Sequence, residues 1–258
     1  MPDQSSQTDP LQGKIALITG ASGGIGYATA LALGRRGCSI AVHYNAAKAK
    51  ADALVAELSQ IGVKAIAFQA EMGNFDQVRK LHADVVEQLG HPDILFNNAG
   101  RTNTVVGMWG DMGSISIDEF EHTWRVNTAS SYLLTQLCLP NMVQNKFGRI
   151  VFCSSVAAGV GGVIGPHYAS SKSALHGLLH WIAIRHAKDG VTCNAVAPAL
   201  IIETSMFENP SEQLKDKIPV GRFGLPHEIA SVVEMLVSNA YMTNKIIVSD
   251  GGMTPSAF

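Results

Sequence analysis

The chain contains little of what marks several large classes of protein. Its 258 residues include four cysteines, Cys38, Cys138, Cys153 and Cys193, which lie far apart and form no CxxC pair. This spacing argues against a disulfide framework or a zinc site, and it predicts buried thiols in an intracellular protein. The formal net charge is −2, so no general attraction to nucleic acid or to an anionic membrane is expected.

Targeting and membrane-spanning patterns are also missing. Residues 1–12, MPDQSSQTDPLQ, have neither the apolar core of a signal peptide nor the arginines of a transit peptide. They predict a disordered N-terminal tail on a cytoplasmic protein. One uncharged run, residues 15–34, is long enough to raise the question of a membrane span. It contains five glycines, so a strand, a loop and a helix explain it better.

What the sequence does contain is a regular alternation of two patterns. Short apolar, β-branched runs alternate with segments of helical apolar spacing. Strands are expected at KIALITG, SIAVHY, KAIAFQA, DILFNNAG, GRIVFCSS, VTCNAVAP and KIIVSDGG, and helices at about 21–37, 46–61, 75–89, 118–145, 168–188 and 227–239. This order predicts βαβ units and a parallel sheet with helices on both faces. No linker or repeat interrupts it, so residues 13–258 are expected to form a single domain.

The junction between the first strand and the first helix is rich in glycine. Residues 19–26 read TGASGGIG. Glycines allow a tight turn and let a pyrophosphate approach the backbone, and the helix N-terminus supplies free N–H groups. Glycine runs also make ordinary turns, but the strand before and the helix after favour a dinucleotide site.

Three motifs follow one another along the chain: TGxxxGxG, NNAG at 97–100 and YxxxK at 168–172. Together they resemble the short-chain dehydrogenase/reductase family, and the resemblance runs from Lys14 to Gly252. It implies an α/β fold, a Rossmann-type doubly wound three-layer αβα sandwich with a seven-stranded, mostly parallel sheet that binds NAD(H) or NADP(H). GRIVFCSSV, NAVAP, IPVGRFGLPHEIA and DGGM resemble 3-oxoacyl-[acyl-carrier-protein] reductases and related NADPH-dependent carbonyl reductases.

The end of the second strand indicates which nicotinamide cofactor is used. NAD-dependent enzymes hold the adenosine ribose with an acidic residue about 20 positions after the glycine loop. Tyr44 occupies that place, so no carboxylate would repel a 2′-phosphate, and Ser22, Asn45 and Lys48 are near enough in sequence to help bind one. We expect NADP(H) to be preferred. NAD(H) stays open, because no arginine adjoins Tyr44 and a tyrosine that packs on adenine favours neither cofactor.

Other cofactor contacts follow from the resemblance. Glu71 stands where the family has an aspartate that meets the adenine, and Pro198-Ala199 stands where it has a Pro-Gly step near the nicotinamide. The expected cofactor-binding residues are Gly20, Ser22, Gly23, Ile25, Gly26, Tyr44, Asn45, Glu71, Met72, Asn98, Ala99, Gly100, Tyr168, Lys172, Pro198, Ile201 and Thr204.

Tyr168 and Lys172 are the first candidates for catalysis. Hydride transfer to a ketone leaves an alkoxide that needs a proton and a hydrogen-bond donor. The two residues share a helix face, and a cation there favours phenolate, so Lys172 is expected to lower the pKa of Tyr168. In an arbitrary helix such a pair is usually a surface contact. Its place after a nucleotide loop favours catalysis.

The resemblance supplies the other catalytic roles. Ser155, thirteen residues before Tyr168, would bind the substrate carbonyl, and this spacing favours it over Ser154. Asn127 in RVNTAS would order water that links Lys172 to solvent, and Lys172 would also hold the nicotinamide ribose.

Apolar loops mark the substrate side. Residues 101–117 contain Met108 and Trp109, which suit a hydrophobic substrate wall or a subunit interface. Met206 and Phe207 fall where the family has a mobile lid. His167, beside Tyr168, is predicted either to touch substrate or to pack the loop.

Two further histidines could be considered metal ligands from their spacing alone. His176 and His180 have zinc-like spacing but no HExxH glutamate, so no metal site is expected.

The favoured function is an NADPH-dependent ketoreductase acting on a 3-oxoacyl thioester or similar carbonyl, with Tyr168 as general acid. The alternative is an NAD(P)-dependent dehydrogenase of a sugar, polyketide or other secondary alcohol. A nucleotide-sensing regulator ranks last, because Tyr168 and Lys172 are present. An acyl-carrier-protein partner would need a basic patch, for which Arg101, Lys146 and Arg149 are candidates. The resemblance also implies a homotetramer, or a dimer.

Overall fold

The computed structural model describes residues 9–204, 206–207 and 210–255, and these contain a parallel sheet of seven strands in the order β3-β2-β1-β4-β5-β6-β7. The strands are β1 (Ile15–Ile18), β2 (Ser39–Tyr44), β3 (Ala65–Gln69), β4 (Ile94–Asn97), β5 (Gly148–Cys153), β6 (Val191–Pro198) and β7 (Ile246–Ser249). Every neighbouring pair is parallel. The predicted doubly wound sandwich is confirmed, with a sheet that is parallel throughout rather than mostly parallel.

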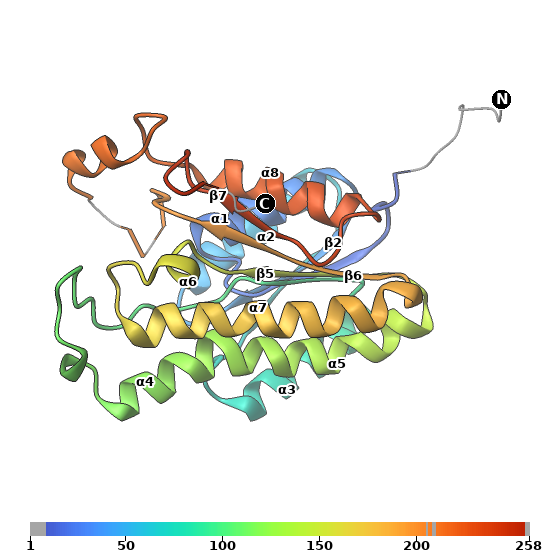
Figure 1. The fold of residues 1–258 in the computed structure, drawn as a ribbon. Coiled ribbons are helices and arrows are strands. Elements are labelled where there is room, and N and C mark those ends of the chain that lie inside the picture. Colours follow the sequence, from blue (N-terminus) through green and yellow to red (C-terminus); the bar gives the residue numbers. More distant parts are fainter. Residues whose placement is uncertain (1–8, 205, 208–209, 256–258) are drawn as a thin grey trace.

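Helices cover both faces of the sheet (Figure 1). They are α1 (Gly24–Arg35), α2 (Lys48–Gln60), α3 (Phe75–Gln88), α4 (Ile117–Trp124), α5 (Ser130–Gln144), α6 (Ala157–Val160), α7 (Pro166–His186) and α8 (Pro226–Ser238). In Figure 1, α1, α2 and α8 lie on one side of the sheet, and α3, α4, α5 and α7 lie on the other.

The central strands are apolar on both faces because both faces pack against helices. Leu95 and Phe152 belong to the core under α5 and α7, whereas Phe96 and Val151 belong to the core under α1 and α8. This alternation follows from the side-chain period of two in a strand. All the predicted strands are present. Several end earlier than predicted, because their last residues form the loops at the carboxyl edge.

The chain is already packed before residue 13. Leu11 is fully buried, and its N–H donates to Asp9 Oδ1 over 2.9 Å. Asp9 forms an ion pair with Arg36, whose Nη1 lies 2.6 Å from Glu234 Oε1. The predicted disordered tail therefore does not extend to residue 12, while its first eight residues lie outside the described residues. A single leucine among polar neighbours was too weak a signal to predict this packing.

A wider turn divides the helix predicted over residues 118–145. Helix α4 ends at Trp124, and Arg125–Ala129 form a π-helical turn before α5 begins. Such turns are frequent at functional sites. Asn127 lies in this turn, is buried, and donates from Nδ2 to Ser171 Oγ of α7 over 3.0 Å.

The order of the strands reverses at β1. The chain passes from β1 to β2 and β3 on one side, then crosses to β4 on the other. In open α/β sheets, ligands bind outside the carboxyl ends of the strands at this point. The loops after β1 and β4 therefore flank the expected site.

Candidate active site

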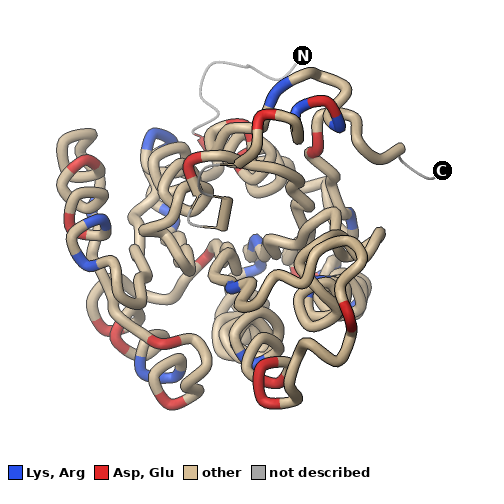
Figure 2. The backbone as a smooth tube through the Cα atoms, turned by 90° about the vertical axis from the view of Figure 1, so that its left-hand side faces the viewer, with Lys and Arg blue, Asp and Glu red and all other residues tan. Residues whose placement is uncertain are grey.

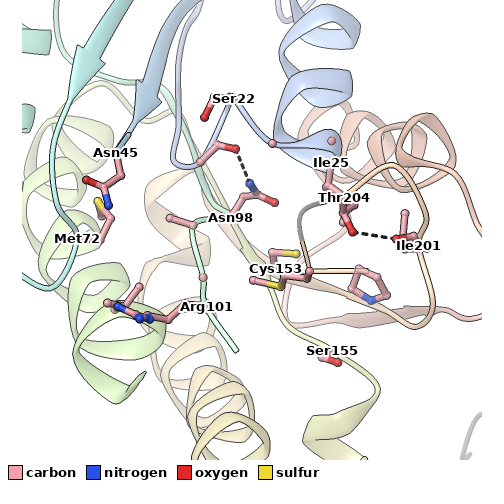
Figure 3. A pocket seen from close by; sticks show the side chains of 18 of the residues that line it. Ser22, Ile25, Asn45, Met72, Asn98, Arg101, Cys153, Ser155, Ile201 and Thr204 are labelled. Atoms are coloured by element: carbon pink, nitrogen blue, oxygen red, sulfur yellow. Dashed lines mark hydrogen bonds between the residues drawn. The ribbon is translucent and has the colours of Figure 1, made fainter. Parts of the chain in front are cut away.

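A cavity of about 700 Å³ opens at the carboxyl ends of strands β1 to β6 (Figure 3). The predicted site residues that line it are Gly20, Ser22, Gly23, Ile25, Asn45, Glu71, Met72, Asn98, Ala99, Gly100, Ser155, Tyr168, Lys172, Pro198, Ile201, Thr204, Met206 and Phe207. Those that do not line it are Gly26, Tyr44, Met108, Trp109, Asn127 and His167. The cavity thus joins the glycine loop, the NNAG motif and the YxxxK motif.

Two glycines of the loop are required for different reasons. Gly20 has a φ of +64°, a conformation that side-chain-bearing residues rarely adopt. Gly26 lies behind the loop, where an added Cβ would stand 2.4 Å from Gly20 O and 2.8 Å from Asn98 Nδ2. Gly26 therefore shapes the loop without lining the cavity.

Hydrogen bonds tie the glycine loop to the end of β4. Thr19 Oγ1 accepts the N–H groups of Asn98 and Ala99, each over 2.9 Å. Asn98 Nδ2 donates back to Thr19 O over 2.9 Å and to Gly20 O over 3.2 Å. The amide of Asn98 therefore holds two cavity walls together.

His43 ties the same loop to β2, and the sequence interpretation missed it. Its Nδ1 accepts the N–H of Gly20 over 2.9 Å, and its Nε2 lies 3.0 Å from Ala70 O. Because Nδ1 is an acceptor, Nε2 carries the proton and the ring is neutral. Burial lowers the pKa of His43 to about 4. Its place in a buried strand next to the glycine loop was the available signal.

Of the residues expected to bind the cofactor at the end of β2, only some lie at the cavity. Tyr44 packs against the core under α1 and α2 instead of lining the cavity, whereas Asn45 does line it. Lys48 points elsewhere and pairs with Asp52 at 2.7 Å on an exposed face. Among described lining residues the one carboxylate is Glu71, whose Oε1 accepts the N–H of Gly73 over 2.9 Å.

Tyr168 and Lys172 lie buried on α7 at the opposite end of the cavity. Lys172 Nζ donates to Cys153 O over 2.7 Å and lies 5.7 Å from the centre of the Tyr168 ring. Burial raises the pKa of Tyr168, with a smaller contribution from Cys153, and a hydrogen bond with Ser155 opposes that rise. Burial also lowers the pKa of Lys172. The expected lowering of the Tyr168 pKa by Lys172 is therefore not seen, because burial dominates.

Asn127 lies behind the cavity wall. Its Oδ1 accepts the N–H of Arg101 over 2.9 Å, and its Nδ2 donates to Arg101 O over 3.1 Å. A Cβ on Gly100 would lie 3.2 Å from Lys172 Nζ and 3.4 Å from Asn127 Oδ1. Asn127 and Lys172 thus flank Gly100, and the side chain of Asn127 fixes the backbone of Arg101.

Comparison with known proteins agrees with this geometry. The family model for short chain dehydrogenases matches residues 14–215. The chain belongs to the short-chain dehydrogenase/reductase family. It is therefore an oxidoreductase acting on CH–OH or C=O groups, of a family that uses NAD(H) or NADP(H) and acts on small-molecule substrates.

Relatives of this short-chain dehydrogenase differ in their named activities. The chain is 36% identical to an L-rhamnose 1-dehydrogenase (NADP(+)) of Thermoplasma acidophilum, over 94% of this chain and 96% of the relative. It is 36% identical to a 3-oxoacyl-[acyl-carrier-protein] reductase of Synechocystis, over 94% and 98%. It is also 36% identical to a versicolorin reductase of Emericella nidulans, over 96% and 98%.

The residues expected on the substrate side form two pairs, and one of these pairs lines the cavity. Met206 and Phe207 line the cavity, and Phe207 packs edge-on against Phe223 at 5.4 Å between ring centres. Met108 and Trp109 lie outside it, and Trp109 is 94% exposed. In the described structure, the expected hydrophobic wall therefore includes the two lid residues but not these two loop residues.

His167 is fully buried and forms a hydrogen bond with the loop after β4. Its Nε2 lies 2.8 Å from Thr102 O, and Nδ1 has no hydrogen-bond partner within the described residues. His167 does not line the cavity, so the contacts support loop packing, the second of the two predicted roles.

Several lining residues were not among the cofactor or catalytic residues expected from the sequence: Gly24, His43, Ala46, Ala47, Arg101, Asn103, Val126, Cys153 and Ser154. Ser154 Oγ lies 2.7 Å from Nε2 of His176, and His180 Nδ1 lies 2.6 Å from Asn244 Oδ1. These histidines thus make separate hydrogen bonds, and the described residues contain no cluster of three metal-ligating side chains.

No described helix is long and apolar enough to cross a membrane.

Proposed function

We propose that this protein is an NADPH-dependent ketoreductase that converts a ketone, a 3-oxoacyl thioester or a similar carbonyl, to a secondary alcohol. The observation that supports this proposal is the single cavity that joins an uncapped helix N-terminus behind a glycine loop to Tyr168, Lys172 and Ser155. The free N–H groups at the start of α1 suit the pyrophosphate of a dinucleotide.

In this proposal the bound dinucleotide supplies the hydride, and the chain supplies the proton. Tyr168 Oη–H gives its proton to the carbonyl oxygen, and Ser155 Oγ–H donates a hydrogen bond to the same oxygen. A tyrosine hydroxyl is protonated at neutral pH, as an acid in the reducing direction must be, and the rise in the pKa of Tyr168 does not change this state. Lys172 Nζ, held by Cys153 O, places positive charge near the phenolate that remains.

Preference for NADPH is supported by the end of β2. Asn45, Ala46 and Ala47 line the cavity there, and no described carboxylate from this segment would repel a 2′-phosphate. Lys50 lines an adjoining hollow together with Ser22 and Ala47, so its positive charge lies near this end of the cavity. We expect kcat/KM at least about tenfold higher with NADPH than with NADH. A higher value with NADH would contradict this preference.

The function is tested by following NADPH oxidation with a panel of ketones that includes an acetoacetyl thioester. Turnover of the thioester supports the proposed substrate class. NADP⁺ reduction with sugars and other secondary alcohols, but no thioester turnover, would favour the alternative dehydrogenase. That alternative is supported by the sugar dehydrogenase relative, which is as similar as the acyl-carrier-protein reductase.

The basic patch considered for an acyl-carrier protein does not form. Arg149 is buried and bonds to the carbonyl groups of Val237, Gly148 and Gly190. Lys146 pairs with Asp189 before β5 begins, whereas Arg101 lies in the cavity at the carboxyl ends of the strands. On the side seen in Figure 2, basic and acidic positions are interspersed. A substrate that is free in solution fits this charge pattern better than a carrier protein docked at these residues.

A further inference from the structure

Arg101 is a cationic residue of the cavity that the proposed chemistry does not use. Among the described lining residues, Arg101 and Lys172 are the arginine and the lysine. Lys172 is buried and bonded to Cys153 O, whereas the side chain of Arg101 is exposed. The role of Arg101 therefore has to be found in what its side chain faces.

The backbone of Arg101 is held in place on both sides. Asn127 accepts its N–H and donates to its carbonyl oxygen. Asn127 is itself buried and bonded to Ser171 of α7. The side chain of Arg101 therefore leaves a fixed point in the cavity wall.

From that point the side chain turns away from the catalytic end. Its Nε donates to Asn103 Oδ1, and its Nη1 donates to His122 Nε2. His122 Cε1 lies 3.2 Å from the position of a Cβ on Gly73, in the turn after β3. In Figure 3 the guanidinium extends toward the Met72 side of the cavity, away from Ser155. Arg101 thus faces the part of the cavity formed by the ends of β2 and β3.

The guanidinium keeps binding capacity in this position. It has five N–H donors, and Nη2 makes no hydrogen bond with the described residues. Arg101 forms no ion pair with a described carboxylate.

We propose that Arg101 binds the adenosine diphosphate half of the dinucleotide rather than the substrate. In a doubly wound fold the pyrophosphate lies at the glycine loop and the adenosine extends toward the second strand. A guanidinium in that half attracts the phosphates and can stack on the adenine. This inference rests on the proposed function, because it requires a nicotinamide dinucleotide in the cavity.

The test compares Arg101→Gln with the unchanged protein by calorimetric titration of two probes, NADPH and 5′-ADP. Loss of one charge-assisted contact is expected to raise both dissociation constants roughly tenfold. The increase should shrink at high salt, because part of it is electrostatic. The KM for NADPH should rise in parallel, with little change in kcat and in the KM for the ketone.

Two further variants sharpen the experiment. Arg101→Lys keeps the charge but loses the planar fork, so it should recover part of the affinity. Arg79→Gln removes an exposed arginine of α3 that pairs with Asp76 and does not line the cavity, so both constants should stay unchanged.

Three outcomes would overturn the inference in distinguishable ways. Unchanged affinity of Arg101→Gln for both probes would remove Arg101 from the cofactor site. A raised KM for the ketone with unchanged NADPH affinity would assign Arg101 to the substrate. Failure of the unchanged protein to bind either NADPH or NADH would reject the proposed function, and this inference with it.

Discussion

At the scale of single residues, burial shifts the pKa values of Tyr168 and Lys172 more than neighbouring charge does. Tyr168 and Lys172 were recognised from their spacing, and the structure brings them into one cavity. The predicted lowering of the Tyr168 pKa was wrong. The spacing of the two residues gives the position of the cation, but it does not show that the phenol loses contact with solvent. Tyr44 and Asn45 show the same limit, since a sequence does not reveal which of two neighbouring residues lines the cavity.

Replacement of Tyr168 by Phe tests the proposed acid. The variant keeps the ring but loses the proton donor, so kcat should fall by about 10²–10⁴-fold. The affinity for NADPH should change far less, because Tyr168 is one of many cavity residues. Tyr241→Phe, at a position that is 98% exposed and away from the cavity, is the matched control and should keep full turnover. Full turnover in Tyr168→Phe would refute the mechanism.

His43 makes stability depend on pH. Its pKa is about 4 in the folded protein and 6.5 in its ordinary state, so the unfolded chain takes up a proton first as the pH falls. The stability contributed by neutral His43 is therefore complete above pH 6.5 and is lost as the pH falls to 4, by about 3 kcal/mol. Urea unfolding at several pH values should show this loss, and His43→Gln should flatten that part of the profile. His227→Gln, at an exposed position, should leave it unchanged.

At the scale of elements, the alternation of strands and helices could be predicted. Each strand is a short apolar run, and each helix repeats its apolar residues at the helical period. The π-helical turn at Arg125–Ala129 could not be predicted, since five residues are too few to show a change of period. Its effect depends on tertiary contacts. Asn127 reaches both Arg101 and Ser171 from this turn, and neither partner is near it in sequence.

Gly26→Ala tests how closely the glycine loop packs against β4. The new Cβ would lie 2.4 Å from Gly20 O and 2.8 Å from Ala21 Cα, so the backbone must shift. Overpacking of this kind costs about 1–3 kcal/mol, and NADPH affinity should fall with it. Gly159→Ala, where an added Cβ meets nothing within 4 Å, should change neither quantity. Equal unfolding free energies and affinities for the two variants would contradict this account of the loop.

At the scale of the whole molecule, helix α7 carries both the proposed catalytic pair and exposed apolar side chains. Tyr168 and Lys172 lie on its buried side, whereas Trp181 and Ile184 are 51% and 69% exposed. Tyr132 of α5 is also half-exposed. An interface between two copies would cover these exposed apolar side chains. We therefore propose that α5 and α7 pair with the same helices of another copy, within a homotetramer or a dimer.

A double variant, Trp181→Glu with Ile184→Glu, tests this assembly. Four negative charges at each symmetric contact, two from each copy, would be brought together and desolvated, so the complex should dissociate. Light scattering should give a mass of two or four times the 27.4 kDa chain for the unchanged protein, and a lower mass for the variant. Ile61→Glu, a partly exposed position at the end of α2, should keep the original mass. If the double variant kept it too, the interface would lie elsewhere. If dissociation also lowered kcat, pairing of α7 would be supporting the geometry of Tyr168 and Lys172 from the opposite side of the same helix.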